Sequence, residues 1–368
     1  MQKKVYLDNA ATSPLCNSFL KNIQELAQKY YNPSASNENS LELRQEIEEC
    51  REKIAKLINC EPEEIYFTSG ASESNSWAID GFIKAQTRDY YRVIATNIEH
   101  TSILNNPRIN GFIECDEYGL VHPEQFEGYR NCLFCVAYGN NEIGTLSPIE
   151  RISEVIHKRG NYLLVDATQS LGKVGINVKK MKIDMLSASG HKLGALKGVG
   201  FLYINKDVDV WPIVYGAQEV GSRGGTYNYL GIKSLSMAID EIDVRKQIQI
   251  MNLRNYLFNE LKKIDGVTIN GHIPYRLPNN LNICIHNIFI DNQQLVSLLD
   301  MNGFVVSAGS ACSNGTAEPS HVLEAIGLTN DEINRSIRIT LGEQNTKEEI
   351  DAFVDCLKNI IEMNKSTN

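Results

Sequence analysis

The chain has 368 residues, of which 42% are hydrophobic, 22% charged and 8% aromatic, an ordinary composition for a globular protein. Its net charge of -9 argues against a general nucleic-acid binder, which needs a basic surface. No apolar run approaches the ~20 residues of a membrane span. We therefore expect no direct nucleic-acid partner and no membrane association.

Nine cysteines are scattered along the chain, and neither their odd number nor their spacing resembles a disulfide framework. The first residues, MQKKVYLDNAATSP, lack the apolar segment of a secretory signal. These features predict a reduced, cytoplasmic protein. The Cys132-x-x-Cys135 pair lies in a hydrophobic run without a second pair, so we assign it to the core and expect neither a metal site nor an iron–sulfur cluster.

In the first two thirds of the chain, short β-branched runs alternate with helical patterns. The expected strands are 92–95, 133–137, 162–165, 183–187 and 200–204, and the expected helices include 72–85 and 149–158. This alternation predicts an α/β fold with a large, mostly parallel sheet.

Residues 227–264 are predicted to form one long helix, because the helical pattern contains no proline. Strands are then expected at 267–270, 280–286, 304–307 and 337–341, with helices near 293–300, 320–325 and 347–361. We therefore predict a large domain over 12–250 and a smaller α+β domain over 251–368, which residues 1–11 join.

Asp166 ends the apolar run 162–165, where a carboxylate is costly to bury without a partner. Ligands of open α/β sheets bind at the carboxyl ends of the strands. The pyridine nitrogen of pyridoxal 5'-phosphate (PLP) is a suitable partner, because a carboxylate keeps it protonated and the ring an electron sink. The alternative is a strand-end aspartate that caps the next turn, and for this segment alone it is the commoner case.

Lys192 closes a Ser-Ala-Ser-Gly-His-Lys segment after the expected strand 183–187, in the next strand unit after Asp166. A lysine amine that is partly withdrawn from water can form a Schiff base with the PLP aldehyde. Ser189 and His191 would bind the phosphate or position the lysine. Most lysines are solvated surface charges, but the small polar residues around this one favour the functional interpretation.

Small residues lead into the expected helix 72–85, and the unpaired N–H groups at a helix N-terminus bind anions. We assign the cofactor phosphate to the N–H groups of Ala71 and Ser72 and to the Ser72 hydroxyl. An ordinary serine N-cap is the alternative for this segment in isolation.

Cys312 lies in the segment 307–316, which is rich in Gly, Ser, Asn and Thr and is unlike the surroundings of a core cysteine. We predict that its thiolate is an exposed nucleophile on a loop, and we assign the other eight cysteines to the core. His100 could stack on a cofactor ring or move protons, and Arg338 could bind a substrate carboxylate with two hydrogen bonds. Neither residue carries an assignment alone.

These residues resemble the motifs of the cysteine desulfurases, class V PLP enzymes of the NifS/IscS type. The matching segments are 5–12 (VYLDNAAT), 31–34 (YNPS), 68–73 (TSGASE), 99–100 (EH), 140–144 (NNEIG), 166–169 (DATQ), 189–192 (SGHK), 223–226 (RGGT), 310–312 (SAC) and 337–338 (IR). Each motif is weak alone, but the set follows the family order across almost the whole chain and is highly specific.

The resemblance implies the type I PLP-dependent transferase (aminotransferase) fold. It also implies the conversion of L-cysteine into L-alanine, with Cys312 attacking the substrate sulfur and becoming a persulfide. Lys192 would carry PLP, and His100 would stack on the ring and relay protons. The remaining implied contacts are Asp166, Gln169 and Asn141 to the ring, Ala71, Ser72, Ser189, His191 and a second subunit's Thr226 to the phosphate, and Asn32 and Arg338 to the substrate carboxylate.

The implied partners are L-cysteine, a second copy of the chain in a homodimer, and a sulfur acceptor, either an iron–sulfur scaffold or a tRNA-thiolation protein. Ser72 replaces the usual threonine, and Val220 and Glu343 stand where arginines are frequent. The printed sequence ends soon after its last expected helix, so we expect the chain to lack the extension that some members use to bind the scaffold. The alternatives are another class V PLP enzyme, such as a selenocysteine lyase or an aminotransferase, and a non-catalytic adaptor of the same fold.

Overall fold

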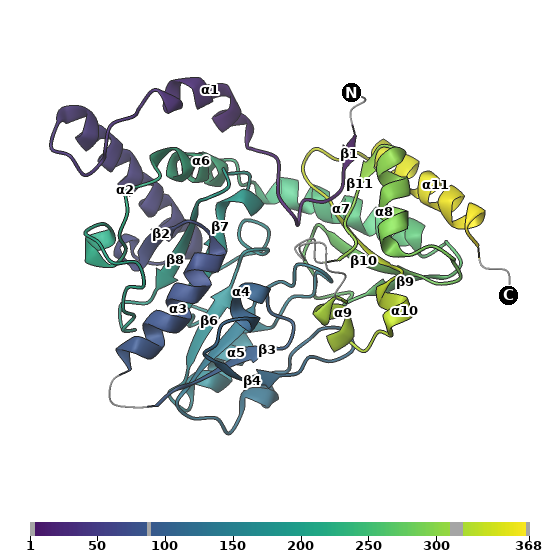
Figure 1. The fold of residues 1–368 in the computed structure, drawn as a ribbon, viewed down its shortest axis with the longest axis horizontal. Coiled ribbons are helices and arrows are strands. Elements are labelled where there is room, and N and C mark those ends of the chain that lie inside the picture. The colour runs from purple at the N-terminus through teal and green to yellow at the C-terminus, as the bar shows by residue number, and fades with distance from the viewer. Residues whose placement is uncertain (1–3, 87–89, 310–318, 366–368) are drawn as a thin grey trace.

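The computed structural model describes residues 4–86, 90–309 and 319–365. Its largest element is a seven-stranded sheet (Figure 1). In spatial order its strands are β2 (Ile65–Thr68), β8 (Gly200–Ile204), β7 (Met185–Ser189), β6 (Tyr162–Asp166), β5 (Cys132–Ala137), β3 (Arg92–Thr96) and β4 (Ile109–Ile113). Strand β8 is antiparallel to both of its neighbours, and the other strands of this sheet all run in one direction.

Both faces of this sheet are covered by helices, because its central strands are apolar on both sides. In β5 every residue is buried, with Phe134 and Val136 in one core cluster and Leu133 and Cys135 in another. The first cluster is completed by α1 (Asn17–Ala27), α2 (Glu38–Ile58), α5 (Ile149–His157) and α6 (Tyr229–Asp240). The second is completed by α3 (Ala71–Ala85) and α4 (Thr101–Leu104).

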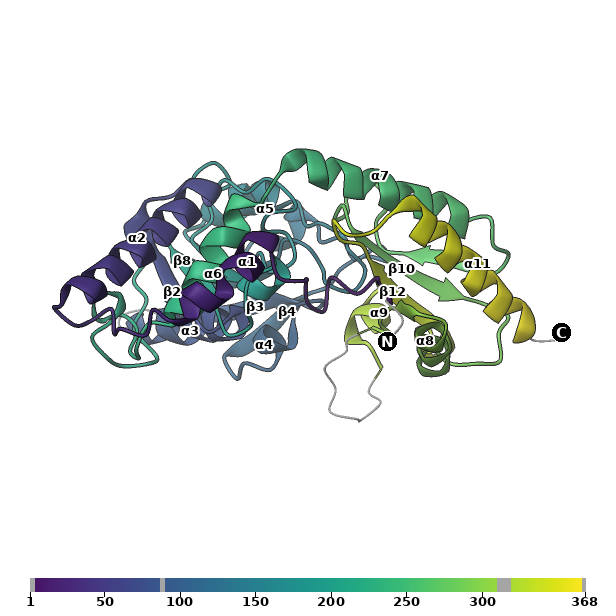
Figure 2. The same cartoon turned by 90° about the horizontal axis from the view of Figure 1, so that it is seen from above.

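A second sheet has three antiparallel strands and its own core. The strands are β9 (Val267–Asn270), β10 (Asn280–Ile285) and β12 (Ser336–Thr340), and α7 (Val244–Leu261), α8 (Asn292–Met301) and α11 (Lys347–Met363) pack on them. Figure 2 shows this unit beside the large sheet, with α7 and α11 running side by side.

The start of the chain contributes to the second unit. Strand β1 (Val5–Tyr6) pairs with β11 (Phe304–Val305), and Leu7 is fully buried in the second core. The expected domain division at residues 250 and 251 falls inside α7 and stays a prediction. The short elements are α9 (His321–Ala325), α10 (Asn330–Ile333) and the 3-10 helices η1 (Pro62–Glu64), η2 (Pro123–Phe126), η3 (Gly190–Lys192) and η4 (Glu219–Gly221).

The prediction of one long helix over 227–264 is wrong, because two helices, α6 and α7, occupy this stretch. Between them, the Glu241 carboxylate accepts the backbone N–H of Ser18 at 2.7 Å, at the start of α1. Asp243 then caps α7 by accepting the N–H of Arg245 at 2.8 Å. The break is therefore fixed by a tertiary contact and a local cap.

The cysteines within the described residues are all unpaired. Five of them are buried, including the CxxC pair in β5, so their assignment to the core is confirmed. Cys60, Cys115 and Cys356 are only partly buried at the edges of the cores, so for these three the assignment holds only in part. Among the same residues, no group of three or more His, Cys, Asp and Glu side chains could hold a metal ion. No helix in the described ranges is long and apolar enough to cross a membrane.

Candidate active site

The predicted cluster of polar residues lies at one edge of the large sheet. Asp166 is the last residue of β6 and pairs in register with Ser187 of the adjacent parallel strand β7, which leads into Lys192. Strands β2 and β3 run in the same direction, so the N-terminus of α3 and His100 follow at the same edge. Parallel strands therefore bring together groups that are far apart in sequence.

Both oxygens of the Asp166 carboxylate have hydrogen-bond donors. The backbone N–H of Thr168 donates to Oδ1 at 2.9 Å, so Asp166 does cap the turn that follows β6. The side chain of Asn75 donates to Oδ2 at 3.0 Å, and Asp166 is only 6% exposed. A buried carboxylate that is held from two sides is oriented to bind a cationic partner. Asp166 can therefore cap the turn and bind such a partner at the same time.

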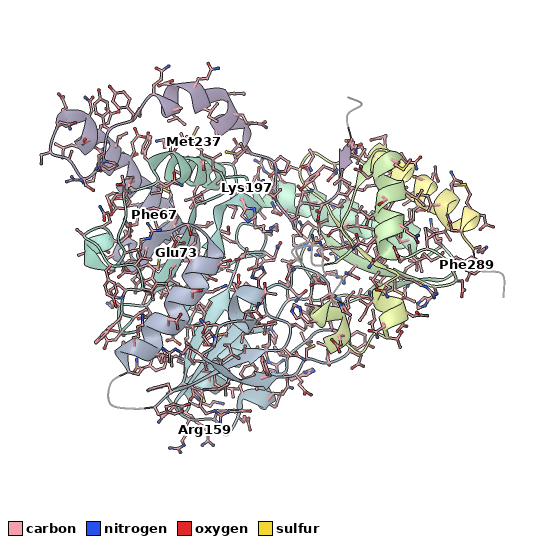
Figure 3. The ribbon with its side chains drawn as sticks, in the orientation of Figure 1. Phe67, Glu73, Arg159, Lys197, Met237 and Phe289 are labelled. Atoms are coloured by element: carbon pink, nitrogen blue, oxygen red, sulfur yellow. The ribbon has the colours of Figure 1, made fainter. Side chains whose placement is uncertain are left out.

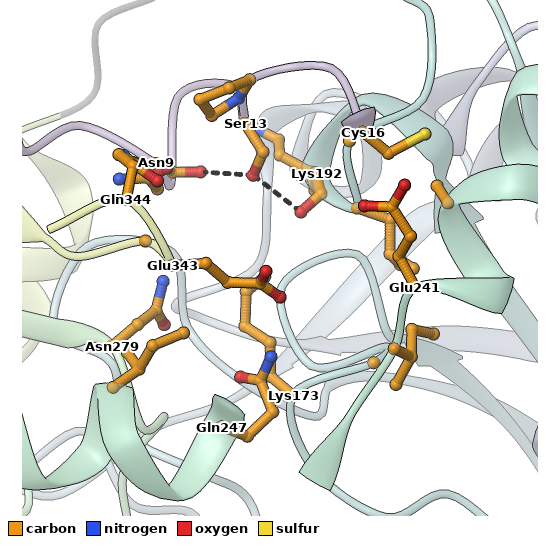
Figure 4. Close-up of a pocket in the computed structure, with 18 of the residues that line it drawn as sticks. Asn9, Ser13, Cys16, Lys173, Lys192, Glu241, Gln247, Asn279, Glu343 and Gln344 are labelled. Atoms are coloured by element: carbon orange, nitrogen blue, oxygen red, sulfur yellow. Dashed lines mark hydrogen bonds between the residues drawn. The ribbon is translucent and has the colours of Figure 1, made fainter. Parts of the chain in front are cut away.

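The Lys192 amine is held by the N-terminal segment. Its Nζ donates to the carbonyl oxygens of Ala10 and Ala11 at 2.5 and 2.7 Å, while Ser13 Oγ donates to the Lys192 carbonyl at 2.9 Å. Lys192 lines a cavity of about 340 Å³ between the two units, and Figure 4 shows the Ser13 contact. The Lys192 amine therefore lies beside the cavity and donates to two uncharged carbonyl oxygens.

A second amine, Lys173, lines the same cavity and donates to the Gln169 carbonyl at 2.9 Å. Burial and the nearby Lys192 lower its pKa to about 7. Gln169 itself is buried, and its side-chain amide donates to the Ala10 carbonyl at 3.0 Å. The Ala10 carbonyl therefore joins Gln169 to Lys192.

Three of the residues predicted to bind a phosphate, Ala71, Ser72 and Ser189, lie at the start of α3. A Cβ atom built on Gly70, the N-cap of α3, would lie 3.6 Å from Ser189 Oγ, so Ser189 faces this terminus. A Cβ atom on Gly200 would lie 2.6 Å from the Gly70 Cα, so this approach requires glycine. Ala71 and Ser72 are the first residues of the 15-residue helix, whose dipole favours an anion.

Positive charge is concentrated beside these residues. Burial, followed by the positive charges of Lys192, Lys197 and Lys173, lowers the pKa of His191 to about 4. Lys197 is labelled near the centre of the molecule in Figure 3. Of these causes, the three lysine charges also favour an anion at this place, whereas burial does not.

His100 lies within electrostatic range of both Asp166 and Lys192. Removal of the ring from bulk water lowers the pKa of His100, the Asp166 charge opposes this effect, and the Lys192 charge adds to it. The ring keeps part of its surface open to solvent. The residue is the N-cap of α4, and its Nδ1 accepts the Ser102 backbone N–H at 3.1 Å.

Arg338 is buried in β12, with its side chain 3% exposed. Nη2 pairs with the Asp8 carboxylate at 2.8 Å, and Nη1 donates to the Asn141 carbonyl at 3.1 Å. Within the described residues, Nε has no hydrogen-bond partner. An orphaned buried donor on a guanidinium is a place for a further acceptor such as a carboxylate.

Cys312 lies outside the described residues, but the chain on either side of 310–318 is placed. Ser307 and Arg338 exchange two backbone hydrogen bonds, of 3.2 and 2.7 Å. On the C-terminal side of residues 310–318, Ser320 Oγ donates to the buried Glu142 carboxylate at 2.6 Å. Both flanks are therefore attached next to Arg338 and the 140–144 segment.

Among the described residues, two predicted site residues make no hydrogen bond to the other residues of the site. Asn32 lies in the connection between α1 and α2, which runs on the left of Figure 2, away from β12. Thr226 is exposed in the connection before α6. Of the two positions where arginines are frequent, Glu343 pairs with Lys246 at 2.7 Å at the cavity, and Val220 is fully exposed.

The chain matches the aminotransferase class-V family over residues 5–353. A cysteine desulfurase IscS of Dictyoglomus turgidum is 38% identical over 98% of this chain and 95% of its own length. One of Methanosarcina thermophila is 36% identical over 98% of this chain and 92% of its own.

Two solved structures show the same fold. A NifS-like protein superposes with a TM-score of 0.89 at 30% identity and covers 98% of this chain and 100% of that one. SspA in complex with cysteine gives a TM-score of 0.82 at 31% identity and covers 94% of this chain and 100% of that one. The chain therefore belongs to the class V aminotransferase family. The predicted type I PLP-dependent transferase fold, α/β with a mostly parallel sheet, is confirmed.

Proposed function

We propose that this chain is a cysteine desulfurase, a PLP-dependent enzyme that converts L-cysteine into L-alanine and passes the sulfur to Cys312. The observation that carries this proposal is the near-complete overlap with relatives named cysteine desulfurase, at 36–38% identity over 98% or more of the chain. The gathering of Lys192, Asp166 and His100 at one sheet edge supports it.

The residues of the site fit PLP. When bound, PLP would supply an aldehyde for an amine and a ring that takes up the electrons released at the substrate α-carbon. Lys192 would supply the amine, and Asp166 would accept a hydrogen bond from the ring nitrogen. The ring hydroxyl and one ring edge are assigned to Gln169 and Asn141. The N–H groups of Ala71 and Ser72, with Ser189 and His191, would bind the phosphate.

The substrate would be held and attacked by this chain's own groups. Arg338 binds the carboxylate through its orphaned Nε and an Nη group, and the Lys192 amine takes the α-proton. The Cys312 thiolate then attacks the substrate sulfur: an S–S bond forms, the C–S bond breaks, and its electron pair goes to the β-carbon, which gains a proton. The placed flanks of 310–318 beside Arg338 support this assignment.

A homodimer would complete the site. Thr226 would reach the phosphate of the neighbouring subunit, and Asn32 would bind the substrate carboxylate together with Arg338. Exposed aromatic side chains, which are enriched in protein interfaces, support the dimer. Tyr30, on the Asn32 side, is 82% exposed, and Tyr215, on the Thr226 side, is 76% exposed. The acceptor of the sulfur, either an iron–sulfur scaffold or a tRNA-thiolation protein, is proposed on the family resemblance. The unpaired described cysteines support a cytoplasmic location.

The proposed reaction is tested by incubating the PLP-loaded protein with L-cysteine and a thiol reductant. We expect alanine and sulfide in equal amounts and no keto acid. In a parallel reaction with a 2-oxo acid added as the amino acceptor, conversion of cysteine into its keto acid with amination of the acceptor would instead identify an aminotransferase. Turnover of selenocysteine but not of cysteine would identify a selenocysteine lyase.

Replacing Arg338 with lysine should raise the KM for cysteine by about ten- to a hundredfold and lower kcat less. Lysine keeps the charge opposite Asp8 but lacks the planar fork that binds a carboxylate through two hydrogen bonds. Steady-state kinetics of alanine formation measure both constants. Arg335→Lys is the matched control, because Arg335 is half-exposed and pairs with Asp331 away from the site. An unchanged KM in Arg338→Lys would remove Arg338 from the substrate site.

A further inference from the structure

Asn75 connects the two groups that would face the cofactor ring. It is fully buried in α3, and its Nδ2 donates to Asp166 Oδ2 and to Ser102 Oγ, both at 3.0 Å. Ser102 Oγ lies 2.9 Å from His100 Nδ1. A continuous line of hydrogen bonds therefore runs from Asp166 through Asn75 and Ser102 to His100.

The orientation of the Asn75 amide is fixed by its acceptors. A carboxylate oxygen cannot donate, so the amide must turn its nitrogen toward Asp166. The opposite atom, Asn75 Oδ1, is buried without a hydrogen-bond partner among the described residues. Burying Asn75 Oδ1 without a partner is unfavourable, and in this orientation both N–H groups of the amide donate to Asp166 and Ser102. We therefore expect these two hydrogen bonds to have a function.

The same contacts fix the tautomer of His100. The Ser102 backbone N–H donates to Nδ1 at 3.1 Å, and a backbone N–H has no acceptor capacity, so this contact favours an Nδ1 that carries no proton. With Nδ1 unprotonated, the Ser102 hydroxyl donates to it at 2.9 Å, while the Ser102 oxygen accepts an N–H of Asn75. In the neutral imidazole the proton therefore lies on Nε2.

We propose that Asn75 is a positioning residue: it fixes the Asp166 carboxylate directly and, through Ser102, holds His100 in the form protonated on Nε2. In this form Nε2 donates a hydrogen bond and has no lone pair to accept a proton, so the α-proton goes to the Lys192 amine. The inference rests on the proposed placement of the cofactor ring between Asp166 and His100.

The first arm of the test needs no cofactor. In apoprotein labelled with 15N-histidine, His100 is identified by its loss in His100→Gln. The nitrogen that couples to both carbon-bound ring protons, Nε2, should carry the proton in at least about nine tenths of the molecules. Ser102→Ala removes one of two donors to Nδ1 and should lower this preference several-fold. A ring protonated on Nδ1 in the wild type, or no shift in Ser102→Ala, would overturn the proposal.

The second arm uses PLP. Asn75→Ala should weaken PLP binding about tenfold, the effect of one hydrogen bond to a charged group, and should shift the His100 tautomer as Ser102→Ala does. Ser102→Ala should keep the PLP affinity within about threefold. Asn106→Ala is the matched control, because Asn106 is also buried and donates to a carboxylate, that of Asp80.

PLP affinity within twofold of the wild type in Asn75→Ala would contradict the positioning role. If Asn75→Ala fails to fold, the Ser102→Ala result on the tautomer decides. A wild-type protein that forms no bond between PLP and Lys192 would refute the cofactor placement instead. The apoprotein measurement then still decides whether Asn75 and Ser102 set the tautomer of His100.

Discussion

Lys192→Ala should lower the turnover of L-cysteine by more than about 10³-fold and abolish the visible absorbance of the imine that joins this lysine to PLP. The substitution removes the amine that links PLP and the base that takes the α-proton, and positioned proton transfer alone contributes 10²- to 10⁴-fold. Alanine formation and absorbance spectra of the PLP-loaded variant measure the two effects.

Lys173→Met is the informative comparison for this variant. Lys173 lines the same cavity, and its lowered pKa of about 7 makes it the rival amine. We expect Lys173→Met to keep the covalent cofactor and at least a tenth of the turnover. The reverse pattern, with the cofactor bond lost in Lys173→Met and kept in Lys192→Ala, would mean that the wrong lysine has been assigned.

Cys312→Ala should lower the formation of alanine from cysteine by at least about 10²-fold while leaving the cofactor absorbance intact. The thiolate is the group that receives the substrate sulfur, and alanine at this position cannot form an S–S bond. Alanine formation and cofactor absorbance must both be measured, because a damaged fold would lower both of them.

Cys356→Ala is the control for Cys312→Ala. Cys356 lies on α11, and burial raises the pKa of its thiol, which lowers the fraction of thiolate at neutral pH and makes it a poorer nucleophile. Alkylation before and after substrate addition, followed by peptide mapping by mass, should find one additional sulfur atom, that of a persulfide, on Cys312 alone. Normal turnover in Cys312→Ala would contradict the nucleophile assignment.

Much of the fold follows from local pattern. The strands predicted at 200–204 and 267–270 have the observed bounds of β8 and β9. Continuous apolar runs such as β5 indicate strands buried on both faces, and these runs end where the polar clusters begin. The rule that ligands bind at the carboxyl ends of parallel strands then places Asp166 and Lys192 together without coordinates.

The remaining contacts depend on tertiary structure that periodicity does not contain. Asp8 meets Arg338 across most of the chain length, and no sequence spacing links them. Asn75 follows the anion-binding turn and has the spacing of an ordinary helical residue, so its contact with Asp166 is visible only in three dimensions. The helix expected over 227–264 failed for the same reason, because Glu241 binds the start of α1.

The central claim is a covalent bond between the ε-amine of Lys192 and PLP. Borohydride reduction of the PLP-loaded protein, followed by proteolysis and mass spectrometry, tests it directly. We predict a single pyridoxyl adduct, on the peptide that contains Lys192. An unmodified Lys192 in material saturated with PLP, or an adduct on Lys173 instead, would contradict the account.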